Sequence, residues 1–161
     1  MPCERCILTN GKAHSFEKIG YIESKKINIY YTRPSLAQEQ DDSPSALTYY
    51  LQHFEETRPN NWIWIFDCQG MKSKDLIQSG LGKQLSLTVQ QRYFDTLDGI
   101  FILNPNWAIK ALLVFIKPFL RKETCSRINL CSNGNLDAIH RIQTLGISSS
   151  DLTTLTRKIT S

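Results

Sequence analysis

The sequence predicts an α/β fold, a single domain with a mostly parallel sheet flanked by helices. From residue 44 onward, segments with the apolar spacing of helices alternate with short apolar runs of strand length, as in right-handed βαβ units. Two of these runs, Trp62–Phe66 and Ile100–Leu103, are apolar on both faces, which is typical of parallel strands covered on both sides. The length of 161 residues is enough for one hydrophobic core, so we assign residues 1–161 to one domain.

The N-terminal residues 1–36 are predicted to form short strands. The candidates are Arg5–Thr9, Ile19–Glu23 and Ile27–Thr32. The third is rich in the β-branched and aromatic residues that strands favour, and Pro34 ends it.

The alternation of helices and strands then begins. Ser43-Pro44 is a capping hydroxyl followed by proline, which predicts a helix start. The strand Trp62–Phe66 follows, and helical residues return from about Ser73, with a helix expected over Lys83–Phe94.

The last third of the chain continues the pattern. The strand Ile100–Leu103 leads into a helix over Trp107–Leu120, whose last turn Pro118 must end or kink because proline lacks an N–H. A third strand is expected over Arg127–Cys131.

Two helices are predicted to close the domain. Asn135 caps the first and Gly146 ends it. Ser150 caps the second, which makes residues 147–161 a C-terminal helical segment.

Composition excludes several classes of protein. A net charge of +4 is too mild to indicate a nucleic-acid binder. The first 25 residues contain no apolar core of a secretory signal, and no 18-residue apolar span could cross a bilayer. An odd number of cysteines, five, favours reduced thiols over a disulfide framework. We therefore expect an intracellular, cytoplasmic protein whose membrane contact is peripheral.

The sequence contains no recognisable catalytic motif. Gly82-Lys83 resembles the end of a phosphate-binding loop, but Ile77 stands where that loop needs glycine and Gln84 where it needs serine or threonine. Asp67 follows a buried strand, and its expected role is to cap the next loop. We predict a protein that is not an enzyme.

The N-terminal cysteines could suggest a metal site. Cys3 and Cys6 form a Cys-x-x-Cys pair with His14 eight residues further on. A structural zinc ion needs four ligands, and the three histidines, His14, His53 and His140, are scattered and predicted to lie at the surface or on helix faces. We therefore predict no metal.

The helix Trp107–Leu120 is the most informative element. Lys110, Lys117 and Arg121 return to one helix face, and residues 107–127 carry five basic residues and one acidic residue, while the rest of the chain is balanced. Such a surface suits an amphiphile, with acyl chains in the apolar region and an anionic headgroup on the cations. The alternative is a buried helix whose lysines reach solvent, and periodicity alone favours that alternative.

Short motifs surround the strand Ile100–Leu103. Arg92-Tyr93-Phe94 ends the preceding helix, Asn104-Pro105 ends the strand, and Lys117-Pro118-Phe119-Leu120 closes the next helix. Together they resemble the CRAL-TRIO lipid-binding domain family over residues 44–146, and look closest to its divergent branch with the BCH-type domains of certain Rho GTPase-activating proteins. Phe94 stands where the family usually has proline.

The resemblance implies a non-catalytic α/β sandwich with an apolar cavity between sheet and helices. The expected ligand is a phospholipid, a phosphoinositide or another lipophile, with no other cofactor, and the expected role is lipid binding or transport at anionic membranes. In lipid-carrying members, the helix after the Asn-Pro strand forms a mobile gate. The candidate cavity residues are Trp64, Phe66, Phe101, Leu103, Phe115 and Phe119. The candidate headgroup and membrane residues are Lys110, Lys117, Arg121 and Lys122.

A second function is left open by the same resemblance. A BCH-like interaction module with a collapsed cavity would bind a small GTPase or a second copy of itself as a homodimer. Co-purified lipid or an open cavity would separate the two functions.

Overall fold

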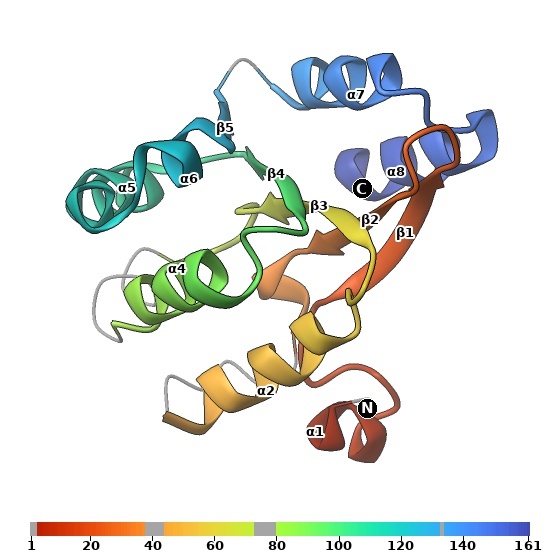
Figure 1. Cartoon of the computed structure of the whole chain (residues 1–161). Helices are drawn as coiled ribbons and strands as arrows, with labels where there is room; N and C mark the ends of the chain where they lie inside the picture. Colours follow the sequence, from red (N-terminus) through yellow and green to blue (C-terminus); the bar gives the residue numbers. More distant parts are fainter. Residues whose placement is uncertain (1–2, 38–43, 73–79, 133) are drawn as a thin grey trace.

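A five-stranded mixed sheet forms the centre of the fold (Figure 1). The computed structural model describes residues 3–37, 44–72, 80–132 and 134–161. The sheet has the strand order β1-β2-β3-β4-β5, with β1 antiparallel to β2 and all other pairs parallel. The strands are β1 (Glu17–Ile22), β2 (Ile27–Thr32), β3 (Asn61–Asp67), β4 (Leu97–Leu103) and β5 (Ile128–Cys131). The predicted α/β class with a mostly parallel sheet is confirmed.

Helices cover both faces of the sheet (Figure 1). One face is covered by α7 (Asn135–Thr144) and α8 (Ser149–Thr160). The other is covered by α2 (Pro44–Glu55), α4 (Leu81–Arg92) and α5 (Trp107–Ile116). Shorter elements complete the described chain: α1 (Glu4–Leu8), η1 (Pro34–Leu36), η2 (Lys117–Phe119) and α6 (Lys122–Ser126).

The face under α7 and α8 is an aliphatic core. Ile65 of β3 and Leu103 of β4 pack there against Ile142 of α7 and Leu155 of α8, and all four side chains are fully buried. Burial of this apolar surface is the main favourable contribution to folding.

The face under α2 and α4 is aromatic instead. Trp62 and Trp64 of β3 surround Phe54 of α2, and the rings of Phe54 and Trp64 meet edge to face with centroids 5.1 Å apart. Tyr93, at the end of α4, closes this cluster.

A register shift in β4 determines which of its side chains reach each face. Trp62 pairs with Leu97, but Ile63 pairs with Gly99, so Asp98 is an extra residue that bulges from the strand. Beyond the bulge, Ile100 lies beside Trp64 and faces the helices α2, α4 and α5.

The structure corrects one predicted strand. Residues Arg5–Thr9 are not a strand, because the segment closes on itself as the short helix α1, with the Ile7 N–H donating to the Cys3 carbonyl at 3.0 Å. The strands predicted at Ile19–Glu23 and Ile27–Thr32 correspond to β1 and β2.

Helix ends show what local signals could predict. Pro118 ends α5 as expected, since the helix stops at Ile116 and continues only as the 3₁₀ turn η2. The predicted caps were misplaced, because Ser148 rather than Ser150 caps α8 by accepting from the Asp151 N–H. Asn135 is the first residue of α7 and follows Gly134 at the cap. Ser43 and the predicted helical start near Ser73 lie outside the described residues.

Candidate functional site

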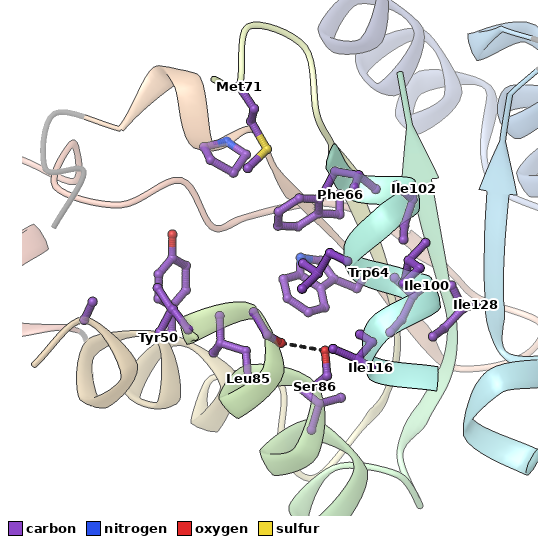
Figure 2. Close-up of a pocket in the computed structure, with 18 of the residues that line it drawn as sticks. Tyr50, Trp64, Phe66, Met71, Leu85, Ser86, Ile100, Ile102, Ile116 and Ile128 are labelled. Carbon is purple, nitrogen blue, oxygen red and sulfur yellow. Dashed lines mark hydrogen bonds between the residues drawn. The ribbon is translucent and has the colours of Figure 1, made fainter. Parts of the chain in front are cut away.

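An apolar pocket lies between the sheet and the helices α2, α4 and α5 (Figure 2). Its volume is about 400 Å³. Pockets that bind small ligands span roughly 300–1,000 Å³ and are lined mostly by apolar side chains. This pocket therefore has the size and lining of a site for a lipophile.

Five side chains of the sheet form the floor of the pocket. They alternate along three parallel strands, and they are Trp64 and Phe66 of β3, Ile100 and Ile102 of β4, and Ile128 of β5. The indole N–H of Trp64 donates to the Thr32 hydroxyl at 2.9 Å. Its only donor is thereby satisfied within the sheet, and the apolar ring faces the pocket.

Three helices supply the walls. Figure 2 shows Tyr50 of α2 on the side of the pocket opposite Trp64, with Leu85 and Ser86 of α4 below them in this view. Helix α5 contributes a row of aliphatic residues, Ile109, Leu112, Leu113 and Ile116.

Helices α4 and α5 meet at a glycine. A Cβ atom added at Gly82 would lie 2.8 Å from a methyl carbon of Leu112, closer than real Cβ contacts allow. A larger residue at position 82 would thus force Leu112 or the helix that carries it to move. The missing side chain lets the two helices approach at the pocket wall.

The polar groups of the pocket lining differ in whether they have a hydrogen-bond partner. The Ser86 hydroxyl is already used, because it donates to the Gly82 carbonyl at 2.7 Å (Figure 2). Burial raises the pKa of the Tyr50 phenol, which therefore stays neutral. The Thr124 hydroxyl is buried in the lining and has no hydrogen-bond partner among the described residues.

An orphaned hydroxyl in a pocket is a sign of a ligand. Buried polar groups are nearly always hydrogen-bonded, and leaving one unpaired costs about 1–3 kcal/mol. Thr124, on the short helix α6 after α5, is 5% exposed. A polar group on a bound molecule would satisfy it.

The structure places the sequence-predicted cavity residues in three locations. Trp64 and Phe66 line the pocket. Phe101 and Leu103 do not, because the bulge at Asp98 turns them to the opposite face, where they pack with α7 and α8.

The two phenylalanines of the gate-like helix are also misassigned. Phe115 and Phe119 are 60% and 49% exposed on the outer side of α5 and η2 and do not line the pocket. The residues that sequence reasoning missed on the sheet are Ile100, Ile102 and Ile128. Strict alternation with Trp64 and Phe66 across neighbouring strands would have found them only if the register of β4 had been known.

The candidate headgroup cations also separate into two kinds. Lys110, Lys117 and Lys122 are exposed. Arg121 is exposed too, but it also bridges to α4: its side chain donates to the Gln90 carbonyl at 2.8 Å, and its guanidinium lies 4.6 Å from the centre of the Phe94 ring.

Phe94 is held from both sides. Arg127 stacks on it with its guanidinium carbon 3.7 Å from the ring centre and donates to the Phe94 and Leu97 carbonyls. These contacts fix the turn between α4 and β4.

The outer side of α5 and η2 carries large exposed apolar side chains. Trp107, Val114, Phe115 and Phe119 are between 49% and 74% exposed. The ammonium group of Lys83 lies 3.8 Å from the centre of the Phe119 ring. We call these four apolar residues, together with the exposed Lys110, Lys117 and Lys122, the outer α5 surface.

Asp67 has a structural position at the end of β3. Its carboxylate accepts from the Gln69 N–H at 3.0 Å, from the Tyr31 hydroxyl at 2.7 Å and from the Asn104 side chain at 2.8 Å. The predicted role of capping the following loop is confirmed. The same carboxylate joins the ends of β2, β3 and β4 beside the pocket.

Comparison with known proteins identifies what the chain is similar to. The sequence model of the CRAL/TRIO domain family matches residues 18–143. A CRAL-TRIO domain-containing protein of Dictyostelium discoideum is 28% identical over 137 residues, which are 78% of this chain and 54% of that protein. The matched range starts in β1, so both N-terminal strands belong to it.

The fold has a similar solved structure. The crystal structure of Sfh5 matches with a TM-score of 0.53 and 15% sequence identity, over 77% of this chain and 48% of that one. At this identity the likeness concerns the fold alone. The chain spans about half the length of both proteins. Within the described residues, every helix is too short or too polar to cross a membrane.

Proposed function

Because this chain belongs to the CRAL-TRIO family, we propose that it binds a lipophile in the pocket under α5 and docks on anionic membranes through the outer α5 surface. Family membership implies the binding of lipophilic ligands. The ligand we propose is a phospholipid or another molecule with one apolar chain in the pocket and a polar group near Thr124.

The observation that carries this proposal is the combination of open apolar volume with one orphaned hydroxyl. A cavity of roughly 150 Å³ already binds benzene, and the pocket here has about 400 Å³. Ser86 and Ser35 donate their hydroxyls to the carbonyls of Gly82 and Gln69, so we propose binding without catalysis.

The alternative function, protein interaction, predicts that the pocket is filled by side chains. A BCH-like interaction module with a collapsed cavity would have side chains where this protein has open space between Trp64 and Tyr50 (Figure 2). The pocket thus supports lipophile binding over that alternative.

Filling the pocket tests the proposal directly. Ile100→Trp adds an indole that occupies the space beside Trp64, and Leu136→Trp makes the same change on α7, where Leu136 is 77% exposed. Native mass spectrometry of the purified proteins should show a bound lipophile in wild type and Leu136→Trp, and about tenfold less in Ile100→Trp. Equal lipid content in all three, or none in wild type after incubation with phospholipid vesicles, would contradict the proposal.

Membrane docking is supported by the outer α5 surface. Exposed aromatic and aliphatic side chains beside lysines form the kind of surface that enters the headgroup region of a bilayer. Each lysine near an anionic surface contributes about 1 kcal/mol, and salt screens that attraction. Docking there would place α5 and the adjoining pocket at the membrane.

A charge-reversal pair tests docking separately from lipid content. Lys110→Glu/Lys117→Glu should reduce co-sedimentation with vesicles of phosphatidylcholine and phosphatidylserine by about tenfold or more, given two charges of about 1 kcal/mol each. Lys25→Glu/Lys26→Glu makes the same change in the exposed β1–β2 turn and should have little effect. Docking through this surface is excluded if both variants sediment equally.

A further inference from the structure

Four side chains from separate parts of the chain converge beside α2. They are two cysteines and two histidines: Cys3, Cys6, His14 and His53. Their sulfur and nitrogen atoms all lie within 4.8 Å of one another, and all four residues are buried. The prediction of a surface or helix-face position is wrong for His14, which is 8% exposed and outside any helix, whereas His53 lies on the buried face of α2 and is 4% exposed. His140, by contrast, is exposed as expected.

The spacing of these atoms fits a tetrahedral metal ion. His14 Nδ1 is 3.5 Å from the Cys3 sulfur and 3.7 Å from the Cys6 sulfur, and His53 Nε2 is 3.4 Å from the Cys6 sulfur. In a tetrahedral zinc site with Zn–S of about 2.3 Å and Zn–N of about 2.0–2.1 Å, neighbouring S and N atoms are about 3.6 Å apart. These three sulfur–nitrogen pairs thus already have the separations that zinc would impose, and all four ligand atoms lie close enough to share one ion.

Neighbouring polar groups contact two of the four proposed ligands, His53 and Cys6. His53 Nδ1 lies 3.3 Å from a carboxylate oxygen of Glu56, within ion-pair distance but without a hydrogen bond, and Nε2 lies 3.4 Å from the Cys6 sulfur. A carboxylate behind a histidine ligand is a common outer-shell partner in zinc sites. The backbone N–H groups of His14 and Ala13 donate to the Cys6 sulfur and hold it in place.

The contacts of the N-terminal segment with α2 are small: the Glu4 N–H donates to the Gln52 side chain at 3.4 Å, beside a small apolar cluster. Helix α1 has five residues, far too few to be stable by itself. Its larger apolar residues, Ile7 and Leu8, are 59% and 76% exposed, and its small core consists of Cys3, Cys6 and Ala13, with Tyr49 against them. A metal bridge from α1 to α2 would add to these small contacts.

We propose that these four side chains bind one Zn²⁺ ion in a closed structural site. Two thiolates and two neutral imidazoles complete a tetrahedral Cys₂His₂ set with no open position for substrate. Binding releases one proton from each cysteine thiol, and the two thiolate charges balance the charge of the ion. The site replaces our expectation of no metal, and it does not depend on lipid binding.

Metal content tests the proposal. The full chain, incubated with Zn²⁺ and then desalted, should contain about one zinc per protein by inductively coupled plasma mass spectrometry. Cys3→Ser and His53→Ala should contain about tenfold less. Cys125→Ser and His140→Ala remove a partly exposed cysteine and an exposed histidine elsewhere and should retain the metal.

A second measurement needs no variant and remains decisive if the ligand variants do not fold. Co²⁺ added to wild type should give the visible absorption bands of tetrahedral coordination and a thiolate charge-transfer band, and Zn²⁺ should displace both. Zn²⁺ should also protect Cys3 and Cys6, but not Cys125, from alkylation.

Three outcomes would overturn the proposal. They are wild-type protein without zinc after loading, octahedral Co²⁺ spectra without a thiolate band, and alkylation of Cys3 and Cys6 at the same rate with and without Zn²⁺. A Cys3–Cys6 disulfide in protein purified without reductant, persisting unchanged when Zn²⁺ is added under reducing conditions, would also exclude the site.

Discussion

The two faces of the sheet differ in packing: one is filled by side chains and the other borders a pocket. Under α7 and α8, residues such as Ile65, Leu103 and Leu155 interlock with no exposed surface. Under α4 and α5, Trp64 and Ile100 border about 400 Å³ of open space. Alternate residues of the same strand thus serve opposite faces, so one face stabilises the domain while the other can keep a pocket.

The largest expected effect concerns the packed face. Leu155→Ala should lower the free energy of unfolding by about 3 kcal/mol, because it leaves a cavity among fully buried neighbours. Ile100→Ala should cost only about 1 kcal/mol, since Ile100 already borders open space. Urea denaturation would measure both free energies of unfolding. Equal losses in the two variants would contradict the conclusion that one face is tightly packed and the other borders open space.

The next effect concerns the orphaned hydroxyl. Thr124→Val should raise the free energy of unfolding of the lipid-free protein by about 1 kcal/mol, because it removes an unpaired buried polar group. The same variant should bind a lipophile with a polar group less tightly. Denaturation of delipidated protein would measure the gain in stability, and a lipid-binding titration would measure the loss of affinity.

Thr57→Val is the matched control for that variant. Its hydroxyl is equally buried, but it donates to the Phe54 carbonyl at 2.7 Å. Losing this hydrogen bond should lower the free energy of unfolding by about 1 kcal/mol. If both threonine variants were destabilised alike, Thr124 would be satisfied within the protein and would not await a ligand.

The smallest effect concerns the link between α4 and the chain after α5. Arg121→Ala removes the hydrogen bond to the Gln90 carbonyl and the stacking on Phe94. With about 0.5–1.5 kcal/mol lost, lipid exchange between protein and vesicles should accelerate roughly threefold to tenfold. Arg157→Ala, which changes an exposed arginine of α8, should leave exchange unchanged in a fluorescent-lipid assay. An unchanged rate in Arg121→Ala would mean that the contacts of Arg121 with α4 do not limit lipid exchange.

The sequence was sufficient for the fold because its signals were local. Alternating apolar segments predicted the parallel strands β3, β4 and β5, and Pro118 predicted the end of α5. Arg5–Thr9 carries no such signal, since a five-residue helix depends on contacts far along the chain.

The site was harder to predict because it depends on register and on distant contacts. The run Trp62–Phe66 is apolar at every position, so its composition does not show which side chains face the pocket. Phe101 was assigned to the wrong face for the same reason. His53 joins Cys6 across 47 positions of sequence, and no spacing rule could have placed it there.

The bulge at Asp98 has a consequence for how such pockets arise and disappear. If β4 paired without the extra residue, Asp98 would stand beside Ile63, and Phe101 would stand beside Phe66 with its ring directed into the pocket. A slip of one position in the pairing of β4 with β3 is therefore enough to direct a phenylalanine ring into the pocket, with no change in the sequence of either strand. The bulge at Asp98 thus holds the register that keeps the pocket open.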